Sequence, residues 1–211
     1  MRIFQVREAG GAARLGILED GRARVLRSAH DAVLTTLDLF EACGERGLVA
    51  SQWAAAAEHA GHFTALPWDD LAHGADLRLT VPVSPPEVWG AGVTYRRSAE
   101  FREEGTGIYD RVYSAERPEL FFKASAWRCV GPGEPIGRRR DSAFTAAEPE
   151  IAIVLGRSGT ILGFTLANDV SAWDIERDIF HDTAPSEIYT GCFAFGPAIV
   201  TPDEIPDPYA I

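Results

Sequence analysis

Three acidic residues are the part of this sequence best suited to do chemistry. Glu148 and Glu150 are two residues apart, and Asp169 follows after a turn signal at Ser158-Gly159. If the chain folds back there as a hairpin with a two-residue loop, continued pairing places Glu148 opposite Asp169. Because side chains alternate between the faces of a strand, Glu150 points the same way as Glu148. The pattern predicts three carboxylates on one face, at one end of a hairpin.

The same register predicts what surrounds these carboxylates. Small or modest side chains such as Ala152 and Gly163 share their face, which leaves room for a site. Leu155 faces Leu162 in this pairing, and an apolar face forms on the other side of the hairpin. That predicted apolar face consists of Ile151, Ile153, Leu155, Leu162, Phe164 and Leu166.

Clustered carboxylates repel one another unless a cation neutralises them. A ligand set made only of oxygens suits Mg²⁺, with Mn²⁺ and Ca²⁺ as alternatives, better than zinc. Mg²⁺ usually keeps open positions that a bidentate 2-keto acid can occupy. The pattern alone leaves open a second interpretation, in which these are ordinary surface acids on a solvated strand edge.

The chain that positions this hairpin has an α+β pattern that is mainly β. We predict a small N-terminal α+β domain over residues 1–75 and a second, β-rich domain over 76–211. In the first domain, Asp20-Gly21 is a hairpin signal. Gly44 and Gly61 are expected to end its two helices. The expected elements are strands at Ile3–Val6, Arg14–Ile17 and Ala23–Leu26 and helices at Asp31–Cys43 and Ala50–Ala60.

In the second domain, a long polar and arginine-rich stretch from Tyr95 to Arg117 is typical of a lid or binding loop. The predicted strands are Val88–Val93, Glu119–Lys123, Glu150–Leu155, Thr160–Asp169 and Cys192–Val200.

Composition excludes several classes of function. The net charge of -11 disfavours binding to nucleic acid, because an acidic surface repels phosphates. No apolar run is long enough to cross a membrane, and the start lacks the features of a secretion signal, so we expect a cytoplasmic protein. The three cysteines, Cys43, Cys129 and Cys192, form no Cys-x-x-Cys pair; we expect buried, inert thiols, although a nucleophilic cysteine stays open.

The acidic motif has a familiar form. Glu148-x-Glu150 followed by Asn168-Asp-Val-Ser-Ala172 is similar to the metal-binding core of the fumarylacetoacetate hydrolase family. The resemblance covers roughly residues 88–205 and implies a twisted β-roll in which Glu148, Glu150 and Asp169 hold Mg²⁺. It also implies a homodimer or homotetramer.

Further motifs resemble the branch of that family that dehydrates 2-keto-3-deoxy-sugar acids, such as 2-keto-3-deoxy-D-arabinonate, to 2,5-dioxo acids. These motifs are Val93-Thr-Tyr-Arg-Arg-Ser98, Tyr109-Asp-Arg-Val-Tyr113, Glu116–Lys123 and Trp173-Asp-Ile-Glu176. The resemblance implies a Mg²⁺-dependent hydro-lyase acting on a small 2-keto acid. Tyr95, Arg96, Arg111 and Lys123 are the expected substrate ligands, and Ser98, Lys123 and Glu119 the expected catalytic residues.

Two departures keep other functions open. Hydrolytic members have a His-Glu pair where this chain has Ser98, which disfavours carbon–carbon hydrolysis because a neutral hydroxyl is a poor base. Dehydratase relatives have a lysine where this chain has Glu187. The alternatives are therefore a metal-dependent hydrolase or decarboxylase of a keto acid, or a binding protein with impaired turnover.

The chain also ends early for this family, at Ile211. We expect the C-terminal part of the β-roll to be missing, so that the protein is either truncated or covered by another chain.

Overall fold

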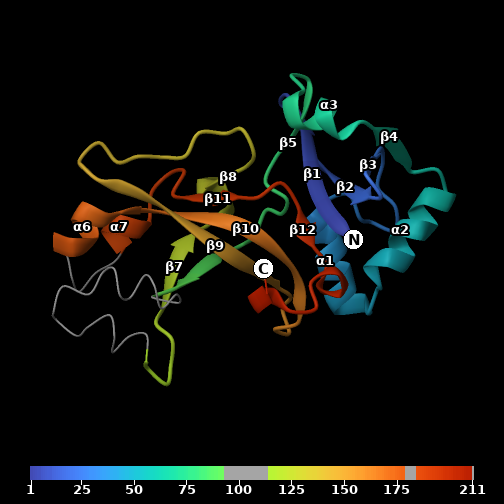
Figure 1. Ribbon diagram of the computed structural model, residues 1–211. Helices are drawn as coiled ribbons and strands as arrows, with labels where there is room; N and C mark the ends of the chain where they lie inside the picture. Colours follow the sequence, from blue (N-terminus) through green and yellow to red (C-terminus); the bar gives the residue numbers. More distant parts are fainter. Residues whose placement is uncertain (93–113, 179–183, 211) are drawn as a thin grey trace.

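The computed structural model describes residues 1–92, 114–178 and 184–210 (Figure 1). Most of its strands belong to one curled sheet, in the order β4-β3-β2-β1-β12-β10-β11-β8, with β5 beside β1 and β9 beside β10. A separate pair, β6–β7, lies next to the long β9–β10 hairpin. The first strands are β1 Arg2–Glu8, β2 Ala13–Glu19, β3 Arg22–Leu26, β4 Phe63–Leu66, β5 Leu77–Leu79 and β6 Val88–Ala91. The others are β7 Leu120–Ala124, β8 Cys129–Val130, β9 Thr145–Leu155, β10 Ile161–Ala172, β11 Phe193–Phe195 and β12 Ile199–Val200.

The described helices are short. They are α1 Thr36–Arg46, α2 Ala50–His59, α3 Trp68–His73, α6 Trp173–Asp178 and α7 Ala184–Glu187, with 3-10 turns at Ala126–Arg128, Pro202–Glu204 and Pro208–Ala210. None of the helices in these ranges combines the length and apolar character needed to span a bilayer. The prediction of a mainly β, α+β fold is confirmed.

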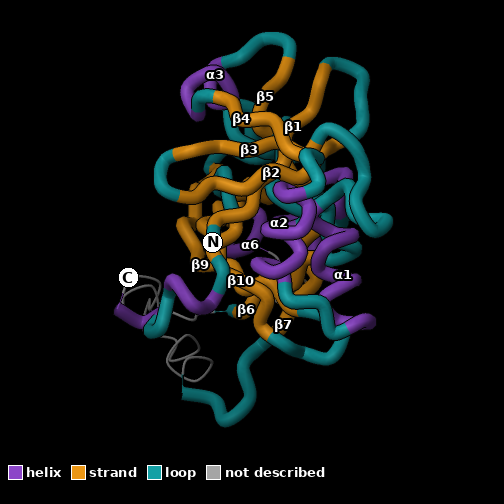
Figure 2. The backbone as a smooth tube through the Cα atoms, turned by 90° about the vertical axis from the view of Figure 1, so that its right-hand side faces the viewer, coloured by secondary structure: helices purple, strands orange, loops and turns teal. Residues whose placement is uncertain are grey.

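In the N-terminal unit, α1 and α2 lie side by side over the sheet formed by β1, β2 and β3 (Figure 2). The predicted hairpin turn is confirmed: Glu19 pairs with Arg22, and Asp20 and Gly21 both have positive φ angles. The buried face joins strand residues to helix residues such as Leu39 and Trp53. The apolar side chains of the strands and of the two helices therefore pack together in one core layer.

The first helix begins later and ends later than predicted. Thr35 caps α1 by accepting from the backbone N–H of Asp38, whose side chain in turn accepts from the Thr35 N–H. This capping box fixes the start, because it satisfies N–H groups that have no partner within the helix. Gly44 lies inside the helix, and Gly47 ends it in the left-handed conformation.

The β9–β10 hairpin keeps the predicted register over most of its length. Glu148 pairs with Asp169, and the pairing continues in step to Val154 with Gly163. Beyond that point the prediction was wrong, because an irregularity in β10 makes Leu155 pair with Ile161. The turn is accordingly longer than two residues, and the backbone N–H of Gly156 donates to Thr160. A bulge of this kind shifts alternation by one residue.

The apolar face predicted for the hairpin is partly exposed and is interrupted at Leu162. Ile153, Leu155 and Leu166 are 52%, 60% and 64% exposed. Leu162 lies on the other side with Val154 and packs against the N-terminal core. The prediction that the six apolar residues share one face was wrong at Leu162, since the bulge turns this side chain away from Leu155.

The sheet continues across the predicted domain boundary near Asp76. β5 pairs with β1, and β12 lies between β1 and β10 through the pairs Ile3–Ile199 and Phe164–Val200. Gly163 allows this approach, because a Cβ there would lie 2.8 Å from the Val200 carbonyl oxygen. The predicted strand Cys192–Val200 is thus two short strands, β11 and β12, each with different neighbours.

Candidate metal-binding site

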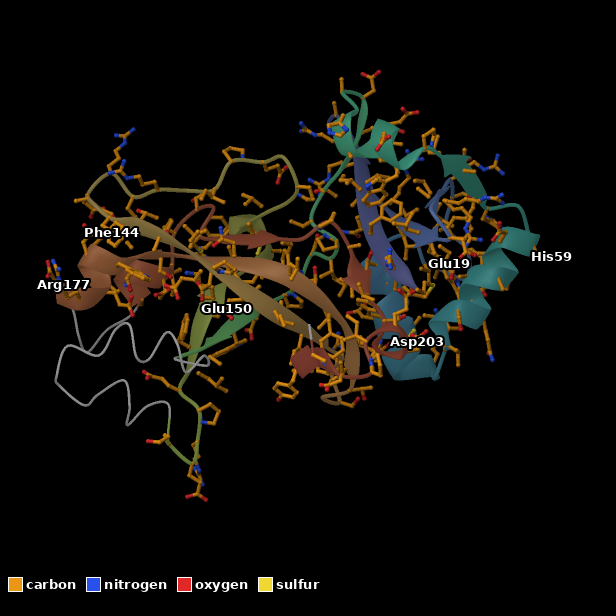
Figure 3. All side chains as sticks on the ribbon, viewed as in Figure 1. Glu19, His59, Phe144, Glu150, Arg177 and Asp203 are labelled. Carbon is orange, nitrogen blue, oxygen red and sulfur yellow. The ribbon has the colours of Figure 1, made fainter. Side chains whose placement is uncertain are left out.

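The acidic residues lie where β9 and β10 pair most regularly. Glu148 faces Asp169, and Glu150 faces Ala167 one step further along the same face. All three carboxylate-bearing residues are partly buried. Figure 3 labels Glu150 near the middle of the molecule, where β9 runs past the β6–β7 pair. The backbone therefore sets the three side chains on one face and within two residue pairs of one another.

Two neighbouring groups hold carboxylate oxygens of this set. The indole Nε1 of Trp173, the first residue of α6, donates to Glu148 Oε1 at 2.6 Å. The ammonium of Lys123 lies 2.5 Å from Asp169 Oδ1. The backbone N–H of Glu148 also donates to Asn168 Oδ1, which ties the two strands together at this level. These contacts fix the orientation of the carboxylates.

As the side chains stand, no group of three or more His, Cys, Asp or Glu residues within 1–92, 114–178 and 184–210 is arranged to hold a metal ion. The donor chemistry still fits a hard divalent cation, because three carboxylates project from one face of adjacent strands. The backbone register supplies the placement that such a site needs.

Lys123 is the most unusual group nearby. It lies on β7 with a side chain that is 0% exposed, and its Nζ contacts Asp169 Oδ1, Glu187 Oε2 and the Val170 carbonyl oxygen at 2.5, 2.5 and 3.0 Å. Burial lowers its pKa, but the charges of Glu187 and Asp169 outweigh this effect and raise the pKa above its ordinary value. Lys123 is therefore a permanent buried cation. Its Nζ donates to Glu187 Oε2 and the Val170 carbonyl oxygen and forms an ion pair with Asp169, and the role of Lys123 as a substrate ligand stays a prediction.

Glu187, at the end of α7, is the second buried charge. Its Oε2 accepts from Lys123 and, at 3.0 Å, from the hydroxyl of Ser171. Burial raises the pKa of Glu187 to about 7, with Lys123 opposing the shift and Asp169 adding to it. Burial likewise raises the pKa of Asp169, while Lys123 lowers it and Glu148 raises it. The pair of carboxylates thus shares one ammonium.

Sequence reasoning missed this pairing. The sequence marks Glu187 as a departure from relatives, but no local signal shows that it lies against Lys123, 64 residues away. Ser171 carried a usable signal, because it is two residues after Asp169 on one strand and so shares its face. The position of Trp173 beside Glu148 follows from the helix α6 that starts directly after β10.

The other predicted residues lie apart or outside the described ranges. Glu119 is exposed just before β7 and lies four residues from Lys123, about 13 Å along an extended strand. Tyr95, Arg96, Ser98 and Arg111 lie outside the described residues. The structure therefore joins Lys123 to the acidic face through Asp169, and the role of Glu119 stays a prediction.

The cysteines are poor nucleophiles. Burial, with a contribution from Cys192, raises the pKa of Cys129 to about 12. Burial also raises the pKa values of Cys43 and Cys192, and all three thiols are free. Because the thiolate is the reactive form, this arrangement agrees with the expectation of inert thiols.

Comparison with known families decides the classification. The model of the fumarylacetoacetate (FAA) hydrolase C-terminal domain matches residues 87–211, which is more than half of the chain and includes β9, β10 and α7. The chain belongs to the fumarylacetoacetate hydrolase family. The resemblance read from the Glu-x-Glu and Asn-Asp-Val-Ser-Ala motifs is confirmed.

Within this family, the chain is 51% identical over 143 residues to 2-dehydro-3-deoxy-D-arabinonate dehydratase of Saccharolobus solfataricus, covering 64% of this chain and 48% of that enzyme. It is 32% identical over 225 residues to mitochondrial oxaloacetate tautomerase fahd2 of Xenopus laevis, covering 99% of this chain and 64% of the relative. The chain spans about half the length of the Saccharolobus enzyme.

A solved structure of a family member is similar over nearly the whole chain. It is 2-keto-3-deoxy-D-arabinonate dehydratase complexed with magnesium and 2,5-dioxopentanoate. The TM-score is 0.76 at 36% identity, and the match covers 99% of this chain and 69% of that one. The expected fumarylacetoacetate-hydrolase-like fold is therefore confirmed.

Proposed function

We propose that this protein is a Mg²⁺-dependent hydro-lyase that removes water from a 2-keto-3-deoxy-sugar acid of the 2-keto-3-deoxy-D-arabinonate type and yields a 2,5-dioxo acid. The observation that carries the proposal is the β9–β10 register, which sets Glu148 opposite Asp169 with Glu150 on the same face. The similarity to a dehydratase solved with magnesium and 2,5-dioxopentanoate supports the reaction class.

In this proposal Glu148, Glu150 and Asp169 hold the cation. A bound Mg²⁺ supplies Lewis acidity, which polarises the 2-keto group and acidifies the neighbouring C–H. Trp173 orients Glu148 through its indole N–H, and Lys123 orients Asp169 through its ammonium. These two contacts restrain the Glu148 and Asp169 side chains on the face that would hold the cation.

The proposed reaction removes one proton from C3 and the hydroxyl group from C4, which gives a 3,4-unsaturated 2-keto acid and one water. Keto–enol tautomerisation then moves one C5 hydrogen and the C5 hydroxyl proton to C3 and C4, so that C5 becomes the second oxo group without any oxidant. We keep Ser98 as a hydroxyl ligand and Tyr95, Arg96 and Arg111 as anion ligands of the substrate, all as predictions from the family motif. Glu119 stays a predicted acid or base. A cytoplasmic location and a homodimeric or homotetrameric state also stay predictions.

The test is product analysis. The full chain is incubated with Mg²⁺ and 2-keto-3-deoxy-D-arabinonate, and mass spectrometry detects the loss of one water. Asp169→Asn is expected to lower kcat by on the order of a hundredfold, since it removes a proposed metal ligand. Asp141→Asn is the matched control, because Asp141 is exposed and bonds Arg139 away from the acidic face.

Loss of carbon dioxide or cleavage into two fragments would instead identify the decarboxylase or hydrolase alternative. Equal activity of Asp169→Asn and Asp141→Asn would remove Asp169 from the mechanism.

A second candidate is a binding protein with impaired turnover. It is favoured by Glu187, a buried carboxylate at the position where the family motif predicts a lysine. Calorimetry with Mg²⁺ and oxalate distinguishes the two functions: saturable binding by a protein that releases no dehydrated product supports the binding protein, whereas turnover excludes it.

A further inference from the structure

The buried ammonium of Lys123 contacts three oxygen acceptors. It donates to Glu187 Oε2 and the Val170 carbonyl oxygen, and it forms an ion pair with Asp169 Oδ1. These acceptors come from β10 and α7, so Lys123 joins three elements, β7, β10 and α7, at one point. A side chain held on three sides has little freedom to move toward a ligand.

Glu187 is held as firmly as Lys123. Its side chain is 6% exposed, and Oε2 receives both the Lys123 ammonium and the Ser171 hydroxyl. Ser171 lies two residues beyond Asp169 on β10, so it reaches Glu187 from the face that carries the acidic set. α7 contacts both β7 and β10, and Figure 1 shows α7 beside the open end of the β9–β10 hairpin, opposite its turn. A buried carboxylate with these two donors has a fixed position.

The charges in this cluster do not cancel. Two carboxylates, Asp169 and Glu187, contact one ammonium, so the group carries one negative charge in excess when both are ionised. With Lys123 and Asp169 alone, a closed ion pair would form, and a metal ion would have to compete with the ammonium for Asp169. Because Glu187 also contacts the ammonium, the charge of Asp169 is only partly neutralised by Lys123, and Asp169 can bind a second cation.

We propose that Glu187 is a positioning residue for the metal ligand Asp169: it divides the charge of Lys123 and so keeps one oxygen of Asp169 available to the cation. This inference rests on the metal-dependent function proposed above. It gives the carboxylate at position 187 a role of its own, instead of treating it as the loss of a lysine.

The experiment measures Mn²⁺ affinity at pH 8 by electron paramagnetic resonance, with no substrate present. Glu187→Gln keeps the size of the side chain and an oxygen acceptor but removes the charge. We expect Mn²⁺ to bind to Glu187→Gln roughly ten- to a hundredfold more weakly than to the wild type. A second variant, Ser171→Ala, is expected to weaken binding by a smaller factor in the same direction, because Glu187 loses the hydroxyl donor that holds its carboxylate in position beside Lys123.

The matched control is Gln5→Leu. Gln5 is buried in the N-terminal unit, where its side chain donates to the Val81 carbonyl and accepts from the Thr36 N–H. Its substitution lowers the stability of the fold without touching the acidic face, so Mn²⁺ affinity should stay at the wild-type value.

Four results overturn the inference or its basis. Equal Mn²⁺ affinity of wild type and Glu187→Gln refutes the positioning role while leaving the proposed function intact. An equal loss in Gln5→Leu refutes it too, since the effect then reflects general destabilisation. Absence of Mn²⁺ binding by the wild-type chain refutes the proposed metal-dependent function itself. If Glu187→Gln does not fold, unchanged affinity in Ser171→Ala refutes the inference in its place.

Discussion

Removal of the buried ammonium is the most direct test of how this site is held together. In Lys123→Met a neutral chain of similar length replaces the lysine, and Asp169 and Glu187 lose the cation that each contacts at 2.5 Å. The Val170 carbonyl oxygen also loses a donor. The variant therefore leaves two carboxylates close together and largely shielded from water, which is the least favourable arrangement for like charges.

The size of the effect follows from the burial. The Lys123 side chain is fully buried, and removing one partner of a buried ion pair costs about 3–5 kcal/mol. A chain of this size loses roughly 2–4 °C of Tm per kcal/mol, so we expect the melting temperature to fall by about 6–20 °C at pH 8. At lower pH the loss should shrink, because the two carboxyls can take up protons in the folded state and relieve their repulsion.

Urea unfolding in the presence of a chelator, followed by circular dichroism, measures this loss without any metal. A double-mutant cycle with Glu187→Gln tests the mechanism. Glu187→Gln should raise the free energy of unfolding much more in the Lys123→Met background, where it removes one of two unpaired charges, than in the wild type, where Lys123 compensates the charge of Glu187. The reasoning is refuted if Lys123→Met costs less than about 1 kcal/mol, or if Glu187→Gln has the same effect in both backgrounds.

The remaining predictions concern pH, packing and the metal ligands. Because the Glu187 pKa is raised from 4.5 to about 7, its contribution to stability is complete below about pH 4.5 and falls by on the order of 3 kcal/mol as pH rises through 7. Urea unfolding at a series of pH values should show the free energy of unfolding of the wild type falling with pH, and a smaller fall in Glu187→Gln. Equal pH dependence in the two proteins would show that Glu187 is not the group that titrates. Gly163→Ala should lower the free energy of unfolding by about 1–3 kcal/mol, because the added Cβ meets the backbone of β12. Gly44→Ala is the comparison in the same urea assay: it lies in open space within α1 and should raise the free energy of unfolding by about 0.5–1 kcal/mol. Trp173→Phe removes the 2.6 Å bond to Glu148 and should weaken Mn²⁺ binding roughly tenfold in a titration; an unchanged affinity would show that the indole does not orient this ligand.

The sequence by itself determined the acidic face. Alternation along two neighbouring segments, joined by a turn signal, was enough to place Glu148 opposite Asp169, and the structure has that pairing. The prediction succeeded because a hairpin is a local element: its register depends on residues that are close in the chain. The Asp20-Gly21 hairpin was predictable for the same reason.

The sequence failed where two local signals compete. The turn at Ser158-Gly159 looked like a two-residue loop, but the bulge near Ile161 lengthens it and turns Leu162 inward. Helix α1 showed the same difficulty, since the sequence predicted a start at Asp31, whereas the capping box at Thr35 decided the boundary. Apolar periodicity gives the existence of an element more reliably than its ends.

Only the tertiary structure decided the partners of Asp169. Lys123 and Glu187 are 64 residues apart and belong to β7 and α7, and neither signals the other in sequence. Their contact depends on how a separate pair of strands packs against the long hairpin and on where a four-residue helix lies beside it. A buried charge is stable only beside its counter-charge, so packing, and not local propensity, sets the electrostatics of this site.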